Sequence, residues 1–202
     1  MKPGIKLIIS GPSGAGKGTV INRLLQRLAA LHEEAYLSIS MTTRYMREGE
    51  ADGVSYYFTD KPSFERLLDE KGLLEHNCYN GEYYGTPAAP AEEAFAAGKI
   101  VLFDIDINGG RQIRERYSDA VTVFLIPPEF RLLESRLRGR ATETEDKILH
   151  RLEIARDEYA AAVDYDYVVI NDSIDDAVEE LLSIITAERC RMSRRAKLLT
   201  IL

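Results

Sequence analysis

The stretch that decides the fold is IKLIISGPSGAGKGT, residues 5–19. Its first six residues form an apolar run that predicts a short buried strand. The segment from Gly11 to Gly18 is rich in glycine, and apolar side chains then recur at helical spacing from Val20 to Leu31. A strand, a glycine-rich loop and an amphipathic helix in this order are typical of the start of a parallel α/β sheet.

The loop matches the front of the phosphate-binding P-loop pattern GxxxxGK between Gly11 and Lys17. Glycines let backbone N–H groups turn toward an anion, and the following helix adds the positive end of its dipole. A lysine at this place bridges the β- and γ-phosphates of a nucleotide. Gly18 stands where a Ser or Thr usually helps to hold Mg²⁺, and with Thr19 it gives a variant that resembles adenylate kinases.

The composition is that of an ordinary globular domain, with 202 residues of which 45% are hydrophobic and 29% charged. That length predicts one domain, or one domain with a small insert. Its apolar runs are shorter than the ~18 residues that span a bilayer, and too short for a signal peptide, so we expect a cytoplasmic protein without a membrane partner. A net charge of −7 disfavours nucleic acid as a partner. The local arginine cluster between Arg131 and Arg151 suits a nucleotide.

The second half of the chain continues the α/β pattern. Apolar runs predict three further strands of the same sheet, at 100–104, 121–126 and 167–170. Helical spacing predicts helices over 130–137, from about 146 to 163, and around 177–185. The predicted fold class is therefore α/β, with a P-loop parallel-sheet core that carries helices on both faces.

The segment 36–92 has a different character. Short β-like pieces at 37–40 and 56–58 alternate with glycine-containing turns, and seven of the 11 tyrosines lie between Tyr36 and Tyr84. Tyrosine offers an apolar ring and a hydroxyl, so such a cluster can line a polar cleft. A β-rich insert with a tyrosine-rich core explains the same composition, and composition alone favours that interpretation.

An ordered set of motifs resembles the guanylate kinase family. The motifs are SMTTR at 40–44, GEADGVSY at 49–56, LE at 74–75, YYGT at 83–86, DID at 104–106, RGR at 138–140 and VIND at 169–172. The resemblance runs from about residue 5 to 195, in that family's order and at its spacings. It implies a P-loop core, a small β-rich insert that binds GMP, and a short lid. The implied division is a single domain over about 5–187, with core 1–35, 93–137 and 164–190, insert 36–92, lid 138–163 and basic tail 188–202.

The resemblance implies which residues bind GMP. They are Ser40, Arg44, Arg47, Tyr56, Glu75, Tyr84, Thr86 and Asp106. The two arginines and two tyrosines would hold the phosphate, since arginine pairs with phosphate through two parallel hydrogen bonds. Ser40, Glu75 and Thr86 would read the base, because a carboxylate accepts from both N1–H and the 2-amino group of guanine, a donor pair that adenine lacks. Without the resemblance, a solvated surface is an alternative for the two arginines, and an exposed strand carboxylate is the favoured interpretation of Glu75.

The resemblance also implies an ATP site. Its residues are Gly11, Pro12, Ser13, Gly14, Ala15, Gly16, Lys17, Gly18, Thr19 and Asn171. The catalytic residues would be Lys17 and the lid arginines Arg136, Arg140 and Arg151, which stabilise charge on the transferring phosphoryl group. Asp104 ends a buried strand and would act on Mg²⁺ through water. The segment from Asp106 to Gly109 also fits the DxxG pattern of GTPases, but no NKxD motif follows and we interpret the match as chance.

The implied activity is that of a guanylate kinase. ATP and GMP, or dGMP, would react with Mg²⁺ to give ADP and the nucleoside diphosphate, for GMP recycling and nucleotide biosynthesis. Gly18 and Thr19 leave open a kinase for another nucleoside monophosphate. A non-catalytic guanylate-kinase-like binding module is a further alternative, which the presence of Lys17 disfavours. The sequence leaves open whether the protein is a monomer or a homo-oligomer.

Overall fold

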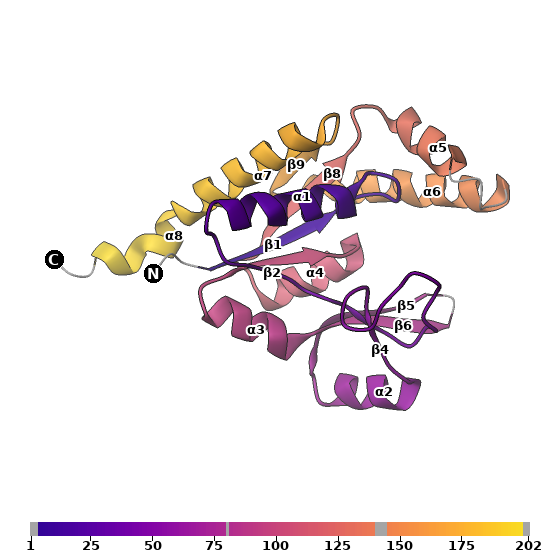
Figure 1. Ribbon diagram of the computed structural model, residues 1–202, viewed down its shortest axis with the longest axis horizontal. Helices are drawn as coiled ribbons and strands as arrows, with labels where there is room; N and C mark the ends of the chain where they lie inside the picture. The colour runs from indigo at the N-terminus through magenta and orange to yellow at the C-terminus, as the bar shows by residue number, and fades with distance from the viewer. Residues whose placement is uncertain (1–3, 80, 140–144, 200–202) are drawn as a thin grey trace.

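A five-stranded parallel sheet forms the core of the protein in the computed structural model, which describes residues 4–79, 81–139 and 145–199. The strand order is β2-β7-β1-β8-β9, so β1 lies in the middle (Figure 1). The strands are β1 Ile5–Ser10, β2 Ala35–Leu37, β7 Ile100–Asp104, β8 Val121–Ile126 and β9 Tyr167–Ile170. The order confirms the predicted parallel α/β class.

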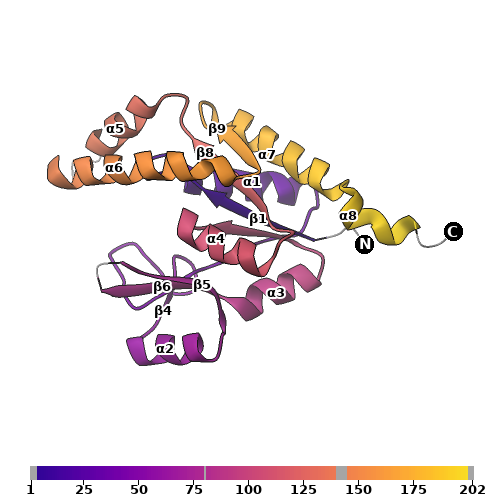
Figure 2. The same ribbon diagram turned by 180° about the vertical axis from the view of Figure 1, so that it is seen from behind.

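Helices cover both faces of this sheet, as Figures 1 and 2 show. Helices α1 (Lys17–Ala30) and α7 (Ile174–Arg189) lie on one face, and α3 (Ala88–Ala96) and α4 (Ile107–Arg116) lie on the other. Side chains of β1 alternate between the two layers, because Leu7 packs with α1 and α7 whereas Ile8 packs with α3 and α4. Burial on both faces explains why β1 reads as an almost continuous apolar run.

A second, smaller sheet lies to one side of the core. Its order is β4-β3-β6-β5, and its strands are β3 Met41–Thr42, β4 Tyr57–Phe58, β5 Leu73–Tyr79 and β6 Glu82–Pro87. The sequence did not predict helix α2 (Lys61–Asp69), which begins after Asp60 and packs the buried Phe64 against Tyr83 at a ring distance of 5.2 Å. The predicted β-like piece at 37–40 contains only the end of β2, which pairs with β7 of the core sheet.

Helices α5 (Phe130–Gly139) and α6 (Glu145–Ala161) form an arm on the same side of the core as the second sheet (Figures 1 and 2). The buried side chains of this arm pack against Ala15 of the glycine-rich loop: Leu133, Leu137, Ile148 and Leu152. A short 3₁₀ turn, η1 (Ala162–Asp164), then leads into β9. The packing brings the arm into direct contact with the loop that the sequence singles out.

The basic C-terminal segment contains α8 (Met192–Arg195) and η2 (Ala196–Leu199), and it is tied to the core by charged contacts. Glu188 is almost fully buried and accepts a hydrogen bond of 2.7 Å from the hydroxyl of Tyr167. It also pairs with Arg191 at 2.9 Å, while Arg194 pairs with Asp119 at 3.2 Å. Within the described ranges, no helix is both long and apolar enough to cross a membrane.

Candidate active site

The glycine-rich loop joins β1 to α1 and is held by close backbone contacts. A Cβ atom on Gly11 would lie 2.2 Å from the carbonyl oxygen of Leu125, so only glycine fits against β8 there. Gly16 has a φ of +91° and a Cβ would lie 2.4 Å from the amide nitrogen of Asn171. Lys17 begins α1 and its Nζ donates to the carbonyl of Gly11 at 2.6 Å. The predicted strand, loop and helix are therefore present, and the Lys17 side chain folds back over the loop to the Gly11 carbonyl.

Asn171 lies directly after β9, where its side chain supports the loop. It is 5% exposed, and its Nδ2 donates to the carbonyl oxygen of Ala15 at 2.7 Å. This contact links the end of the sheet to the loop backbone and explains why Gly16 has no room for a side chain. A place for Asn171 near the adenine of ATP stays a prediction.

Two of the three predicted lid arginines reach the glycine-rich loop. Arg136 of α5 donates from Nη1 to the carbonyl of Gly14 at 3.1 Å, and Arg151 of α6 donates to the hydroxyl of Ser13 at 3.2 Å. The third, Arg140, lies outside the described residues. The contacts place two positive charges from separate helices beside a loop that the sequence predicts to bind phosphate.

Asp104 ends β7 at the carboxyl edge of the core sheet, beside the loop. Ligands of open α/β sheets bind at this edge, where two neighbouring strands lead to opposite sides of the sheet, β1 to β2 and β7 to β8. The surrounding protein atoms raise the pKa of the Asp104 carboxyl although the residue is exposed, and the positive charge of Lys17 counteracts part of this effect.

The donor groups near Asp104 bear on how Mg²⁺ would be held. Gly18 supplies no hydroxyl, and a Cβ there would meet nothing within 4 Å. In the part of the chain that the structure describes, no group of three or more His, Cys, Asp or Glu side chains forms a cage for a metal ion. Mg²⁺ commonly keeps several waters and takes one or two carboxylates plus substrate phosphates. One carboxylate beside a phosphate-binding loop fits that mode.

Glu158 of α6 is a half-buried residue near Lys17 and Asp106 that sequence reasoning missed. Burial raises the pKa of its carboxyl, the charge of Lys17 lowers it, and the nearby Asp106 raises it further. The carboxylate therefore lies within electrostatic range of both the loop lysine and the N-terminus of α4. Its position in a helix with many charged residues gave no signal, because a solvated helix face has the same composition.

Glu75 and Thr86 come together on the second sheet, as the sequence predicts for base-reading residues. Glu75 on β5 is 7% exposed and Thr86 on β6 is fully buried. The Thr86 hydroxyl donates to Oε1 of Glu75 at 2.6 Å. Burial raises the pKa of Glu75 to about 7, while the hydrogen bond from Thr86 lowers it and the charge of Asp106 raises it. The second carboxylate oxygen, Oε2, has no hydrogen bond to a described residue.

Helix α4 begins beside this pair. Asp106 caps the helix, because its Oδ1 accepts from the backbone N–H of Gly109 at 2.8 Å. Its Oδ2 accepts from the amide of Asn77 on β5 at 3.3 Å. A Cβ on Gly109 would lie 2.9 Å from Oε2 of Glu75, so the glycine leaves the space that the carboxylate needs. The DxxG match from Asp106 to Gly109 thus has a local structural role.

Gln112 of α4 was also missed by sequence reasoning. Its Nε2 donates to the carbonyl of His76 at 2.9 Å, and its Oε1 accepts from the N–H of the same residue at 3.1 Å. His76 follows Glu75 directly on β5. The core helix therefore holds the strand that carries the predicted base-reading carboxylate.

Three of the four predicted phosphate-binding residues lie together in the structure, namely Arg44, Tyr56 and Tyr84. The guanidinium carbon of Arg44 lies 5.4 Å from the ring centre of Tyr56, which meets Tyr84 edge to face at 6.1 Å. Burial raises the pKa of Tyr56. The side chain of Arg47 is exposed. Ser40 immediately precedes β3, and its carbonyl accepts from the N–H of Tyr57 at 2.9 Å.

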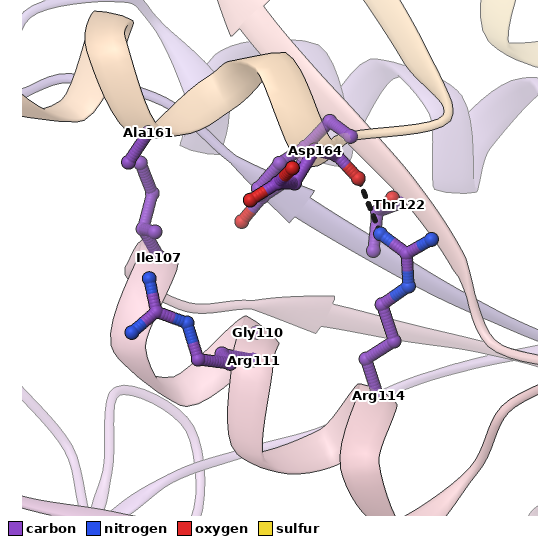
Figure 3. A pocket seen from close by; sticks show the side chains of 8 residues that line it. Ile107, Gly110, Arg111, Arg114, Thr122, Ala161 and Asp164 are labelled. Atoms are coloured by element: carbon purple, nitrogen blue, oxygen red, sulfur yellow. Dashed lines mark hydrogen bonds between the residues drawn. The ribbon is translucent and has the colours of Figure 1, made fainter.

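A separate pocket of about 330 Å³ lies beside α4 and β8 (Figure 3). It is lined by Ile107, Gly110, Arg111, Arg114, Thr122, Ala161, Asp164 and Tyr165, which are different residues from the predicted site. Arg114 donates to the carbonyl of Asp164 and lies 3.5 Å from the carboxylate of Asp166. The pocket is therefore a gap between α4 and the end of the arm, partly bridged by an ion pair.

Comparisons with known proteins agree with this arrangement. Residues 4–188 match the family model described as guanylate kinase. A guanylate kinase from Carboxydothermus hydrogenoformans is 42% identical over 194 residues, which cover 96% of this chain and 93% of that protein. One from Synechococcus is 48% identical over 174 residues, covering 86% and 91%. The crystal structure of guanylate kinase from Anaplasma phagocytophilum has a TM-score of 0.76 and 31% identity, and the match covers 96% of this chain and 90% of that one. The chain belongs to the guanylate kinase family.

Proposed function

We propose that this guanylate kinase binds ATP at the glycine-rich loop and GMP on the second sheet. Family membership assigns the chain an ATP:GMP phosphotransferase activity, with ADP and GDP as products. The main support for placing GMP on the second sheet is the buried pair of Glu75 and Thr86, which lies on that sheet next to α4. A carboxylate with one oxygen held by a threonine and the other open suits a base with two adjacent donors.

The proposed roles on the ATP side follow from the contacts of the loop. Backbone N–H groups of residues 11–19 would surround the β- and γ-phosphates, and Lys17 would leave the Gly11 carbonyl to bridge them. Arg136 and Arg151 would exchange their bonds to the loop for bonds to phosphate oxygens, with Arg140 as a third cation. When Mg²⁺ is bound it would neutralise phosphate charge, with Asp104 holding it through water.

The proposed reaction is a single in-line displacement without a covalent intermediate. An oxygen of the GMP phosphate attacks the γ-phosphorus, and the bond to the β-phosphate oxygen breaks with its electrons leaving on ADP. This chain's residues contribute positioning and charge. Lys17 and the lid arginines neutralise the equatorial oxygens, and Arg44, Arg47, Tyr56 and Tyr84 hold the acceptor phosphate. We propose the insert 36–92 as the GMP-binding part and 138–163 as the lid that excludes water.

The proposed base recognition depends on the charge of Glu75. In its ionised form it accepts from N1–H and the 2-amino group of guanine, whereas adenine presents an acceptor at N1 and would be repelled. The Thr86 hydroxyl keeps the carboxylate in one orientation. Ser40 and Asp106 complete the proposed acceptor site, at the start of β3 and at the N-terminus of α4.

A coupled assay of ADP release tests the proposal with GMP, dGMP, AMP, CMP, UMP and dTMP as acceptors. We expect GMP to give the highest kcat/KM and dGMP to follow. Preference for another base would indicate a different monophosphate kinase, and binding of ligands without turnover would indicate a binding module.

The Lys17→Ala variant tests the catalytic loop. It should fold normally and lose ~10²-fold or more in kcat, since a charge-assisted contact to the transferring group is removed. Lys99→Ala is the matched control, because Lys99 lies just before β7, at the opposite end of that strand from Asp104, and pairs with Glu34 at 3.5 Å. Near-normal turnover of Lys17→Ala would contradict the assignment of the loop.

A further inference from the structure

Arg44 already has a strong partner in the loop between β3 and β4. Its Nη1 donates to Oε2 of Glu50 at 2.9 Å and its Nη2 donates to Oε1 at 2.7 Å. The carboxylate therefore binds both terminal nitrogens, at the end of the guanidinium fork. Nη1 also donates to the carbonyl of Tyr45 at 2.7 Å. Three of the five N–H donors of Arg44 are therefore used inside the protein.

The two remaining donors of Arg44 lie together. They are the Nε–H and the second N–H of Nη2, which point the same way along one side edge of the planar guanidinium. The Tyr84 hydroxyl lies close enough to this group to help raise the pKa of Arg44. The Tyr56 and Phe58 rings lie 5.4 and 5.8 Å from the guanidinium carbon, and the Arg44 side chain is 13% exposed. The fork is thus held in one orientation, with the Tyr84 hydroxyl close to it.

Glu50 also organises the second predicted phosphate-binding position. Its Oε2 accepts from the backbone N–H of Arg47 at 2.8 Å. The hydrogen bonds from Arg44 and Arg47 lower the pKa of Glu50 to about 2, so it is ionised at any working pH. The loop from 43 to 56 has no strand or helix of its own to fix the two arginines. One carboxylate supplies that order by joining the side chain of Arg44 to the backbone of Arg47.

We propose that Glu50 is a positioning residue for the acceptor phosphate, which holds the end of the Arg44 fork so that its side edge faces the phosphate of the bound nucleotide. The proposal rests on the function proposed above and adds a residue that acts through Arg44 and does not touch the substrate itself. Two effects oppose each other when Glu50 is removed. Arg44 gains net positive charge for the phosphate, but it loses its orientation and the loop loses its order, and the second effect dominates.

Steady-state kinetics of Glu50→Gln and Glu50→Ala test this proposal. Both variants should raise the KM for GMP ~10-fold or more, since charge-assisted hydrogen bonds that fix the fork are lost, and leave the KM for ATP within about twofold. Glu48→Gln is the matched control, because Glu48 is an exposed carboxylate of the same loop with the same charge. A fall in the KM for GMP would show that Glu50 competes with phosphate, and an unchanged KM or an equal rise for both substrates would also overturn the proposal.

A double-mutant comparison shows whether Glu50 acts through Arg44. If it does, Arg44→Ala combined with Glu50→Ala should raise the KM for GMP no more than about twofold beyond Arg44→Ala alone. Multiplication of the two single effects would contradict a positioning role. An assay of the wild-type protein distinguishes a failure of this proposal from a failure of the proposed function. If the wild type does not phosphorylate GMP, only the proposed function is contradicted. Calorimetric titration with GMP then compares wild type and Glu50→Gln without turnover, and equal affinities would overturn the role of Glu50.

Discussion

Replacement of Glu75 by Gln should stabilise the protein above neutral pH while it weakens the recognition of guanine. Burial raises the pKa of Glu75 to about 7 in the folded protein, from an ordinary value of 4.5. In the unfolded chain the carboxyl loses its proton near pH 4.5, whereas the folded protein keeps it up to about pH 7. The folded state therefore binds more protons in this window, so this carboxyl lowers the free energy of unfolding as pH rises through it.

The size of the effect follows from the pKa. One pKa unit corresponds to ~1.4 kcal/mol, so a pKa raised from 4.5 to about 7 costs up to roughly 3 kcal/mol of folding free energy at pH 8, but only about 1 kcal/mol at pH 5. The glutamine side chain of the variant would keep the shape and accept from Thr86 without carrying a charge. The stability advantage of Glu75→Gln should therefore grow by about 2–3 kcal/mol between pH 5 and pH 8, or roughly 5–10 °C in Tm for a chain of this size.

Thermal unfolding, monitored by circular dichroism, measures this difference in Tm between Glu75→Gln and wild type. Wild type and Glu75→Gln are compared at pH 5 and pH 8 at one ionic strength, and the difference between them removes the pH dependence of all other groups. Glu48→Gln controls for the loss of one negative charge at an exposed position. A difference in Tm of the same size at both pH values would show that Glu75 is ionised in the empty protein and that burial does not raise its pKa.

Catalysis gives a second measurement of the same carboxyl. In the wild type, kcat/KM for GMP should rise with pH through about 7, as Glu75 ionises in the free enzyme. Glu75→Gln should lack this rise and lie ~10- to 150-fold lower at pH 8, because an amide accepts more weakly than a carboxylate and presents a donor. The substitution should lower kcat/KM for AMP much less than kcat/KM for GMP. Equal losses for both nucleotides would contradict recognition of the base by Glu75.

Three further variants test other parts of the site. Gly18→Ser should fold normally, because a Cβ there meets nothing within 4 Å, and it should lower the Mg²⁺ concentration for half-maximal rate in a titration at fixed ATP. An unchanged midpoint would show that the glycine does not replace a metal ligand. Gly16→Ala should weaken ATP binding ~10-fold or more in calorimetry, because its Cβ would lie 2.4 Å from the amide nitrogen of Asn171 at a φ of +91°. Normal ATP affinity would contradict the role of that contact. Arg47→Ala should raise the KM for GMP ~10-fold and leave that for ATP unchanged, whereas equal changes would place the acceptor site elsewhere.

The core sheet could be predicted from sequence because its strands are buried on both faces. The runs at 5–10, 100–104, 121–126 and 167–170 coincide with β1, β7, β8 and β9. A continuous apolar run bounded by glycine, proline or acid gives a clear signal of a parallel strand. Strand β2 gave no such signal, because its three residues are only half-buried and its place depends on pairing with β7.

The second sheet was harder to predict for the opposite reason. Strands β3 and β4 have two residues each, which is too short for any periodicity. Helix α2 depends on the cap at Asp60 and on one buried side chain, Phe64, which packs against a strand that comes later in the chain. Tertiary contacts decide these elements, so local sequence patterns do not.

The site residues also divide into those that a local sequence pattern predicts and those whose roles depend on tertiary contacts. The glycine-rich loop was predictable because its function requires a fixed local spacing of glycines and lysine. Glu50, Gly109 and Gln112 were not identified as parts of the site, although Glu50 lies inside the motif GEADGVSY and Gly109 ends the DxxG match. Their roles arise from what they contact: Arg44 in the same loop, Glu75 on β5, and the backbone of β5. An isolated acidic, glycine or glutamine residue carries no signal of such a contact.

The two hydrogen bonds between Gln112 and the backbone of His76 make strand β5 move with the core helix α4. The loop that carries Arg44 joins β3 to β4, and β4 lies at the opposite edge of the sheet, three strand spacings or about 14 Å from β5. A rotation of the sheet by about 20° around β5 would displace β4 by about 5 Å and Glu75 by very little. Such a rotation would leave the distance between Glu75 and Arg44 unchanged, because both belong to the rotating sheet, and would instead change the distance between the Arg44 loop and the glycine-rich loop of the core.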